Sequence, residues 1–190
     1  DWSSDVCSSD LIIHPLRDKQ KIRQIFPSEQ LGPVMRFDPA TSRRNIQMGY
    51  YDTMRFMREL PGQLYYFSEK ADGFAAFAAL PENAIKAAGI PLRLPEGLSP
   101  RRALFEHILP AVAAELRLPR EAGYDDLLLA LLEHRADQLG IGRFRWYTPA
   151  QLQAVIAEST ALPEEPRRPL LRSRPLEAAE ILAAALPLLG

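Results

Sequence analysis

The chain has 190 residues with 23 basic and 24 acidic side chains, so its formal net charge is −1. A charge this close to zero provides no bulk attraction to a polyanion, which argues against nucleic acid as a partner. The hydrophobic content of 47% and the charged content of 25% are typical of a globular domain. No run approaches the roughly 18 apolar residues that a transmembrane helix needs, so the sequence predicts no transmembrane segment.

The amino-acid composition favours a mainly α fold without disulfides. Leucine and alanine dominate and β-branched residues are sparse, which favours helices over strands. Seventeen prolines divide those helices into short pieces. The single cysteine, Cys7, excludes an internal disulfide and a multi-cysteine zinc site. The sequence therefore points to no metal ion and no cofactor.

Residues 1–10 do not resemble the start of a natural protein. They are polar, lack an initiator methionine and lack the apolar region of a signal peptide. The stretch Asp5–Leu11 resembles a translated sequencing adapter, so we expect residues 1–10 to be an artefact and further natural sequence to lie upstream. The alternative is a native, disordered polar tail. No cellular compartment follows from either reading.

The first elements are expected between Leu11 and Phe67. The apolar run Leu11–Pro15 is typical of a buried strand, and residues 17–26 have the pattern of a brief amphipathic helix. Asp38-Pro39 begins a stronger helix that ends at Pro61-Gly62. One face of this helix is predicted to be apolar and buried, namely Ile46, Tyr50, Met54 and Met57. Gln63–Phe67 then reads as an edge or hairpin strand.

From residue 69 onwards the pattern is helical. Helices are expected over 81–88, from Ser99 with a kink at Pro110, over 124–139, and from Thr148, where a capping box begins a helix that buries Leu152, Val155 and Ile156. These pieces predict a small helical bundle over residues 69–162. Residues 163–175 are rich in proline and arginine and read as a linker. Residues 176–190 form a last helix, packed on the bundle or against a partner.

A search for catalytic residues finds no local signature. The chain lacks a G-x-S-x-G elbow, a phosphate-binding loop and an H-E-x-x-H pair. The histidines His14, His107 and His134 are scattered, so each is interpreted as structural. Asp72 precedes a glycine, as in an ordinary turn. Asp52 stands out because it follows Gly49 in an aromatic stretch, and a glycine within a helix suggests close packing against that turn.

Three motifs, in a fixed order, resemble a known family. They are P-S-E-Q-L-G at residues 27–32, R-N-I-Q-M-G-Y-Y-D-T at residues 44–53 and L-P-G-Q-L-Y-Y-F at residues 60–67, with Phe37 between the first two. Together they resemble the segment that follows the catalytic core of bacterial patatin-like phospholipases. The resemblance covers residues 11–68, which it identifies as the C-terminal end of a patatin-like α/β domain with one or two short strands.

The resemblance implies a lipid acyl hydrolase in which an aspartate acts as base for a serine nucleophile. In that family the serine lies in G-x-S-x-G and the aspartate in D-G-G or D-G-A, both upstream of the matched segment. Asp72-Gly73-Phe74 has the wrong third residue and follows the match, so the dyad aspartate is not assigned to it. The chain is therefore expected to be an inactive fragment whose parent protein acts on lipid acyl esters, with Tyr50, Tyr51 and Asp52 as a structural support.

Two other interpretations remain. The chain could be a complete helical interaction module in which the helix over 176–189 docks on another protein. It could also be a regulatory or nucleic-acid-binding protein that uses Arg143, Arg145, Trp146 and Tyr147 as a basic and aromatic patch, although the net charge argues against this. The fragment of a patatin-like phospholipase is preferred. Apolar faces left open in a fragment predict poor solubility.

Overall fold

A computed structural model of the chain describes residues 24–32, 38–95, 97–161 and 173–187. The predicted artefact, the strand over 11–15, Cys7 and His14 lie outside these residues. Most of the helix predicted over 17–26 also lies outside, and its described end, residues 24–26, is not helical. The described chain is mainly helical with two very short strands, which confirms the predicted fold class.

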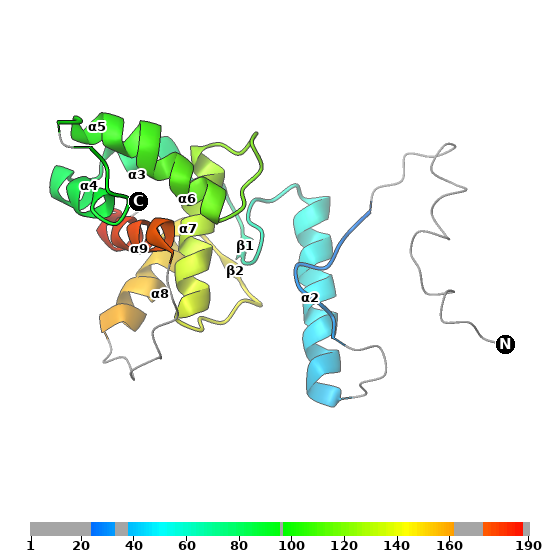
Figure 1. The fold of residues 1–190 in the computed structure, drawn as a ribbon. Helices are drawn as coiled ribbons and strands as arrows, with labels where there is room; N and C mark the ends of the chain where they lie inside the picture. Colours follow the sequence, from blue (N-terminus) through cyan, green and yellow to red (C-terminus); the bar gives the residue numbers. More distant parts are fainter. Residues whose placement is uncertain (1–23, 33–37, 96, 162–172, 188–190) are drawn as a thin grey trace, which may run out of the picture.

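The helix α2 (Pro39–Met57) stands beside the other helices and is joined to them by the segment that follows it (Figure 1). It begins as predicted: Asp38 is the N-cap, its carboxylate accepts a hydrogen bond from the backbone N–H of Thr41 at 2.9 Å, and Pro39 opens the helix. The cap's pKa is lowered by its hydrogen bonds from Thr41.

The predicted buried face of α2 is wrong. Ile46, Tyr50 and Met57 are 73%, 57% and 70% exposed, whereas Met48 and Asp52 are buried. The inward face is therefore rotated away from the apolar stripe. The expected close packing at Gly49 is also absent, because a Cβ there would meet no described atom within 4 Å.

The two strands, β1 (Tyr66–Phe67) and β2 (Trp146–Tyr147), are parallel, and Tyr66 pairs with Trp146. A hairpin requires antiparallel neighbours, so the hairpin option for residues 63–67 is wrong, whereas β1 does lie at the edge of the two-stranded sheet. The pairing connects the end of the motif region to a segment 80 residues later in the chain. The aromatic run that was interpreted as a binding patch supplies the partner strand.

The first helices of the bundle are α3 (Gly73–Ala78) and α4 (Glu82–Gly89). Asp72 is the N-cap of α3, since its carboxylate accepts a hydrogen bond from the N–H of Ala75, so it does not occupy an ordinary turn. Gly73 lies against α7, where a Cβ would come within 2.0 Å of the Tyr124 carbonyl oxygen. The Asp-Gly pair thus begins a helix at a point of close backbone contact.

Three consecutive pieces form one longer helix: α5 (Pro100–Arg102), the π-helix η2 (Ala103–Ile108) and α6 (Leu109–Glu115). Pro110 has no N–H to donate, and just before it the N–H of Leu109 bonds to Leu104, five residues back. The kink predicted at Pro110 is thus a wide π-helical turn. The extra residue in that turn buries both Ile108 and Leu109.

The helices α7 (Tyr124–Gln138) and α8 (Pro149–Ala161) follow. The capping box predicted for α8 is confirmed: the Gln151 N–H donates to the Thr148 hydroxyl at 3.1 Å, and the Thr148 N–H donates to the Gln151 side chain at 3.0 Å. Leu152 and Ile156 are buried as expected.

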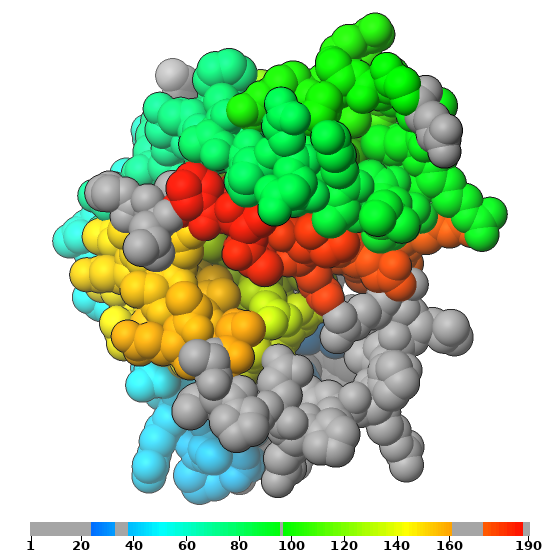
Figure 2. Space-filling view, turned by 90° about the vertical axis from the view of Figure 1, so that its left-hand side faces the viewer, coloured from blue at the N-terminus to red at the C-terminus, as the bar shows by residue number. Residues whose placement is uncertain are grey.

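The last helix, α9 (Arg174–Ala185), packs against α4, α6 and α7. It crosses between α4 and α8 on the face shown in Figure 2. The predicted linker over 163–175 is described only from residue 173, and α9 already begins at Arg174. Ala178, Ala179 and Leu182 are buried, so the inner face of α9 is occupied within the chain. Of the two options expected for this helix, packing on the bundle or against a partner, the structure shows packing on the bundle.

One core connects the strands to the helices. Tyr65 and Phe67 belong to the same buried cluster as the inward side chains of α3 to α9, so β1 is anchored in the helical bundle. No helix of the described residues is both long enough and apolar enough to span a membrane.

Candidate functional site

The motif residues meet where α2 approaches β1. Asp52 is 3% exposed and lies at the centre of this junction. Its carboxylate accepts hydrogen bonds from the Ser28 N–H at 2.8 Å and from the Tyr66 hydroxyl at 3.0 Å. The Arg55 guanidinium, one turn further along α2, lies 3.0 Å from the same carboxylate. Three different segments of the chain are thus attached to a single buried acid.

Ser28 continues the network towards the bundle. Its hydroxyl lies 3.3 Å from the Tyr66 hydroxyl and accepts a hydrogen bond from the Arg143 guanidinium at 3.1 Å. Arg143 also donates to the Leu64 carbonyl oxygen at 2.7 and 2.9 Å. A side chain from a distant part of the sequence therefore crosslinks the first and third motifs.

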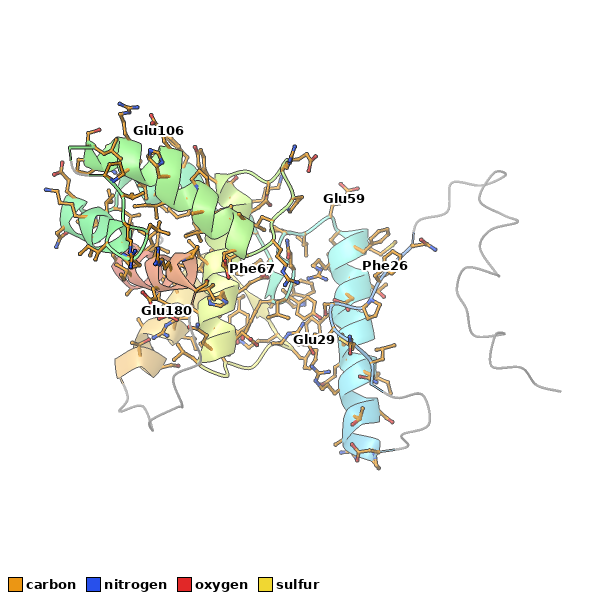
Figure 3. The ribbon with its side chains drawn as sticks, in the orientation of Figure 1. Phe26, Glu29, Glu59, Phe67, Glu106 and Glu180 are labelled. Carbon is orange, nitrogen blue, oxygen red and sulfur yellow. The ribbon has the colours of Figure 1, made fainter. Side chains whose placement is uncertain are left out.

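Glu29 holds the first motif to both α2 and Arg143. Its carboxylate forms ion pairs with Arg44 of α2 and with Arg143. Figure 3 places Glu29 on the side of α2 that faces the bundle, whereas Phe26 lies on the remote side. The Asn45 amide donates to the Leu31 carbonyl oxygen at 2.9 Å and fixes the end of the same loop.

Aromatic rings cover the polar network. The rings of Tyr51 and Tyr66 stack with centroids 4.9 Å apart, and the ring of Trp146 lies 5.4 Å from that of Tyr51. Phe144 completes the cluster, and the Arg55 guanidinium lies 5.2 Å from the centre of the Tyr66 ring. Burial in this cluster raises the pKa of Tyr66, which keeps its hydroxyl protonated and able to donate to Asp52.

A second buried acid, Glu133 of α7, holds the turn before β1. One of its oxygens accepts hydrogen bonds from the N–H groups of Gln63, Leu64 and Tyr65 at 2.8, 3.0 and 2.9 Å. Gly62 makes this approach possible, because it has φ +97 and its Cβ would lie 2.9 Å from the Glu133 oxygen. Burial raises the pKa of Glu133, although the three N–H groups oppose that shift.

The junction has no catalytic arrangement among the described residues. Asp52 binds the Ser28 backbone N–H and not its hydroxyl, so the pair cannot transfer a proton as a Ser-Asp dyad does. The Ser28 hydroxyl is bonded to a phenol and a guanidinium, neither of which is a base at neutral pH. His134 lies beside Gln138 on α7, and His107 is exposed on η2. The contacts instead fix the positions of Ser28, α2 and β1 relative to one another.

An open cavity of about 790 Å³ borders this junction. Asp52 and Arg55 line it on one side and the exposed Phe26 on the other. The carboxylate of Asp52 is already bonded to three donors, so it is not an unsatisfied buried acid that could hold a cation. No three potential metal ligands come together in the described part of the chain.

The sequence identified some of these residues and missed others. Asp52 was singled out, and the structure places it at the centre of the network, but Tyr50 points to solvent. The disfavoured nucleic-acid-binding interpretation places Arg143 in a basic and aromatic patch, whereas the Arg143 side chain is 9% exposed and is engaged in the junction. Glu133 and Arg55 were not identified, and Ser28 was included only as part of the first motif. No local sequence signal marks the contacts of Ser28 and Glu133, since these span at least 24 residues, and Arg55 binds carbonyl oxygens seven and eight residues further along the chain.

Comparison with known proteins gives this chain no relative at the level of family, sequence or fold. No protein-family model, no curated protein sequence and no solved structure matches it.

Proposed function

We propose that this chain is the C-terminal part of a patatin-like phospholipase and that it acts as a non-catalytic support for the α/β domain of that enzyme. The observation that carries the proposal is the junction around Asp52. The three motifs that resemble the family are separate segments within residues 27–67, and Ser28, Asp52 and Tyr66, one from each motif, are bonded to one another.

The exposed face of α2 supports the same proposal. Ile46, Tyr50 and Met57 form an apolar stripe on the side of α2 that the bundle does not cover. Such a stripe is typical of a surface that becomes buried in a larger assembly. In the proposed enzyme the upstream α/β domain covers this stripe, while Asp52 and Arg143 hold the opposite side.

The direct test is to read the coding sequence upstream of the codon for Leu11 in an uninterrupted copy of the gene. The proposal expects the reading frame to continue into D-G-G or D-G-A and, further upstream, into G-x-S-x-G. The whole reading frame should then hydrolyse p-nitrophenyl butyrate, and residues 11–190 alone should not. Turnover by residues 11–190 above a heat-inactivated control, or a frame that contains neither motif, would overturn the proposal.

A second candidate, a helical interaction module, is favoured by the same stripe. In this case the stripe binds another protein and the chain takes part in no reaction. Light scattering after gel filtration tests this on the full chain, because an open apolar stripe promotes self-association. Ile46→Lys is expected to reduce the association, and Ala154→Lys, an exposed site on α8, should leave it unchanged. A monomeric wild type would count against this candidate.

A further inference from the structure

A groove separate from the Asp52 junction lies between α6 and the start of α7. It has a volume of about 610 Å³, within the range of small-molecule sites. The helix η2–α6 contributes Phe105, Leu109 and Ala113, and α7 contributes Tyr124 and Leu127. The loop between α6 and α7 closes the groove. None of its lining residues belongs to the junction that supports the proposed function.

One end of the groove is aromatic. Phe105 and Tyr124 have ring centroids 5.5 Å apart, and Phe74 of α3 lies 5.7 Å from Phe105. Phe74 is 57% exposed and Tyr124 is 40% exposed, so these rings present open apolar surface to solvent. The π-helical turn before Pro110 places Phe105 in this wall, and such turns are frequent at functional sites.

The groove also has one positively charged side chain, Arg120. Arg120 is the only charged side chain among the described residues of the lining, and it comes from the loop that follows the C-terminal end of α6. It is exposed, and within the described part of the chain it forms no hydrogen bond and no ion pair. An unpaired guanidinium beside an apolar wall is complementary to an anion that carries a hydrocarbon chain.

The lining also discriminates between kinds of ligand. A peptide in the groove would bury backbone N–H and C=O groups, each of which needs a partner. The walls offer few partners, because their side chains are almost all apolar and Pro110 and Pro119 have no N–H. A hydrocarbon chain has no polar groups to satisfy, so the lining favours it over a peptide.

We propose that this groove binds one long-chain carboxylate, with its hydrocarbon along Ala113, Ala114 and Leu118 and its carboxylate paired with Arg120. The aromatic rings of Phe105 and Tyr124 shield the part of the chain between them. This assigns the helical bundle a fatty-acid site that is distinct from the junction around Asp52.

The test is calorimetric titration of the full chain with dodecanoate below its micelle concentration. One saturable site is expected, and Arg120→Ala should weaken binding about tenfold, equivalent to about 1.4 kcal/mol. Arg117→Ala is the matched control, because Arg117 is an exposed arginine of the same segment that does not line the groove. Dodecanol should bind about as weakly as dodecanoate binds the Arg120→Ala variant.

A second pair of variants tests the place of the hydrocarbon. Ala114→Trp fills the groove from an exposed position on α6 and should abolish binding, whereas Ala154→Trp on α8 should not. Circular dichroism and thermal unfolding confirm that each variant is folded. The proposal is wrong if the wild type shows no saturable binding, if Arg120→Ala binds as tightly as the wild type, or if Ile46→Lys on α2 removes binding in place of Ala114→Trp.

Discussion

At the scale of single residues, the two buried acids are stabilised in different ways. Asp52 is bonded to a guanidinium, a phenol and a backbone N–H, so its charge is compensated by a cation in direct contact. Among the described residues, only backbone N–H groups donate hydrogen bonds to Glu133. Burial of a carboxylate costs free energy unless partners offset it, so the two acids respond differently to loss of their charge.

Asp52→Asn is expected to lower the free energy of unfolding by about 2 kcal/mol. The amide removes the negative charge opposite Arg55 and replaces one acceptor with a donor that faces the Tyr66 hydroxyl and the Ser28 N–H. Urea unfolding followed by circular dichroism measures the change. Asp137→Asn, at an exposed site on α7, is the control and should have little effect. Equal losses in both variants would contradict the role given to Asp52.

Glu133 predicts a pH dependence. Because burial raises the folded-state pKa of Glu133, this side chain contributes stability at low pH that is lost as the pH rises from about 4.5, its ordinary value, through the raised value. Glu133→Gln keeps an oxygen that can accept the three N–H groups but does not titrate. The unfolding free energy of the wild type minus that of Glu133→Gln should therefore decrease as the pH rises from about 4 to about 8. An increase over this range would show that the N–H groups outweigh burial.

At the scale of elements, two glycines in helices differ in whether packing requires them. Gly49 lies in the interior of α2 with open space where its Cβ would be, so packing does not require it. Gly73 begins α3 in direct contact with the backbone of α7, and its N–H donates to the Asp125 carboxylate at 2.8 Å. Whether the glycine is needed therefore depends on the element that packs against it and not on the residue type.

Substitution of each glycine by alanine should change stability in opposite directions. Gly49→Ala should raise the free energy of unfolding by about 0.5–1 kcal/mol, because alanine restricts the unfolded chain and favours the helix. Gly73→Ala should lower it by about 1–3 kcal/mol, because the new methyl group collides with the Tyr124 carbonyl. Thermal or urea unfolding of the two variants gives the signs. Destabilisation by Gly49→Ala would indicate that another part of the protein covers that turn.

At the scale of the whole molecule, α2 is attached to the bundle mainly through side chains. Asp52 of α2 accepts a hydrogen bond from the Tyr66 hydroxyl, and Arg55 of α2 donates to the Gln63 carbonyl oxygen. The ring of Tyr51 packs on Tyr66 and Trp146, and Arg143 binds Glu29, which is paired with Arg44 of α2. The bundle has its own core from α3 to α9. The attachment of α2 is therefore expected to open at lower cost than the bundle unfolds.

Arg143→Leu should loosen α2 while the bundle stays folded, because it removes the bonds from the bundle to Ser28 and Glu29, which in turn bind Asp52 and Arg44 of α2. Amide hydrogen exchange is expected to accelerate over residues 38–57 and to remain slow in α7 and α9, because those helices are held by the apolar core. Arg145→Leu is the control, since Arg145 is exposed and contacts the Tyr147 ring at 4.4 Å without joining the network. A uniform loss of protection in α2, α7 and α9 would mean that the chain unfolds as one unit.

Local signals explain how far the sequence predicted the elements. Asp38-Pro39, Thr148 with Gln151 and the glycine after α7 act within four residues, so the helix ends they mark were predicted correctly. Pro110 correctly predicted an irregular helix, because a proline lacks the N–H that would hydrogen-bond within its helical turn. The strands were harder, since β1 is only two residues long and its partner lies 80 positions away.

The sequence by itself determined the mainly helical class, the starts of α2 and α8 and the absence of a local catalytic signature, because these depend on composition and on neighbours along the chain. Only the tertiary structure decided which side of α2 is buried. Hydrophobic periodicity selected Ile46 and Tyr50, but the hydrogen bonds of Asp52 with Ser28 and Tyr66 turned the opposite side inward. A polar network between distant segments has no periodic pattern, so its residues are identified only once the chain is folded.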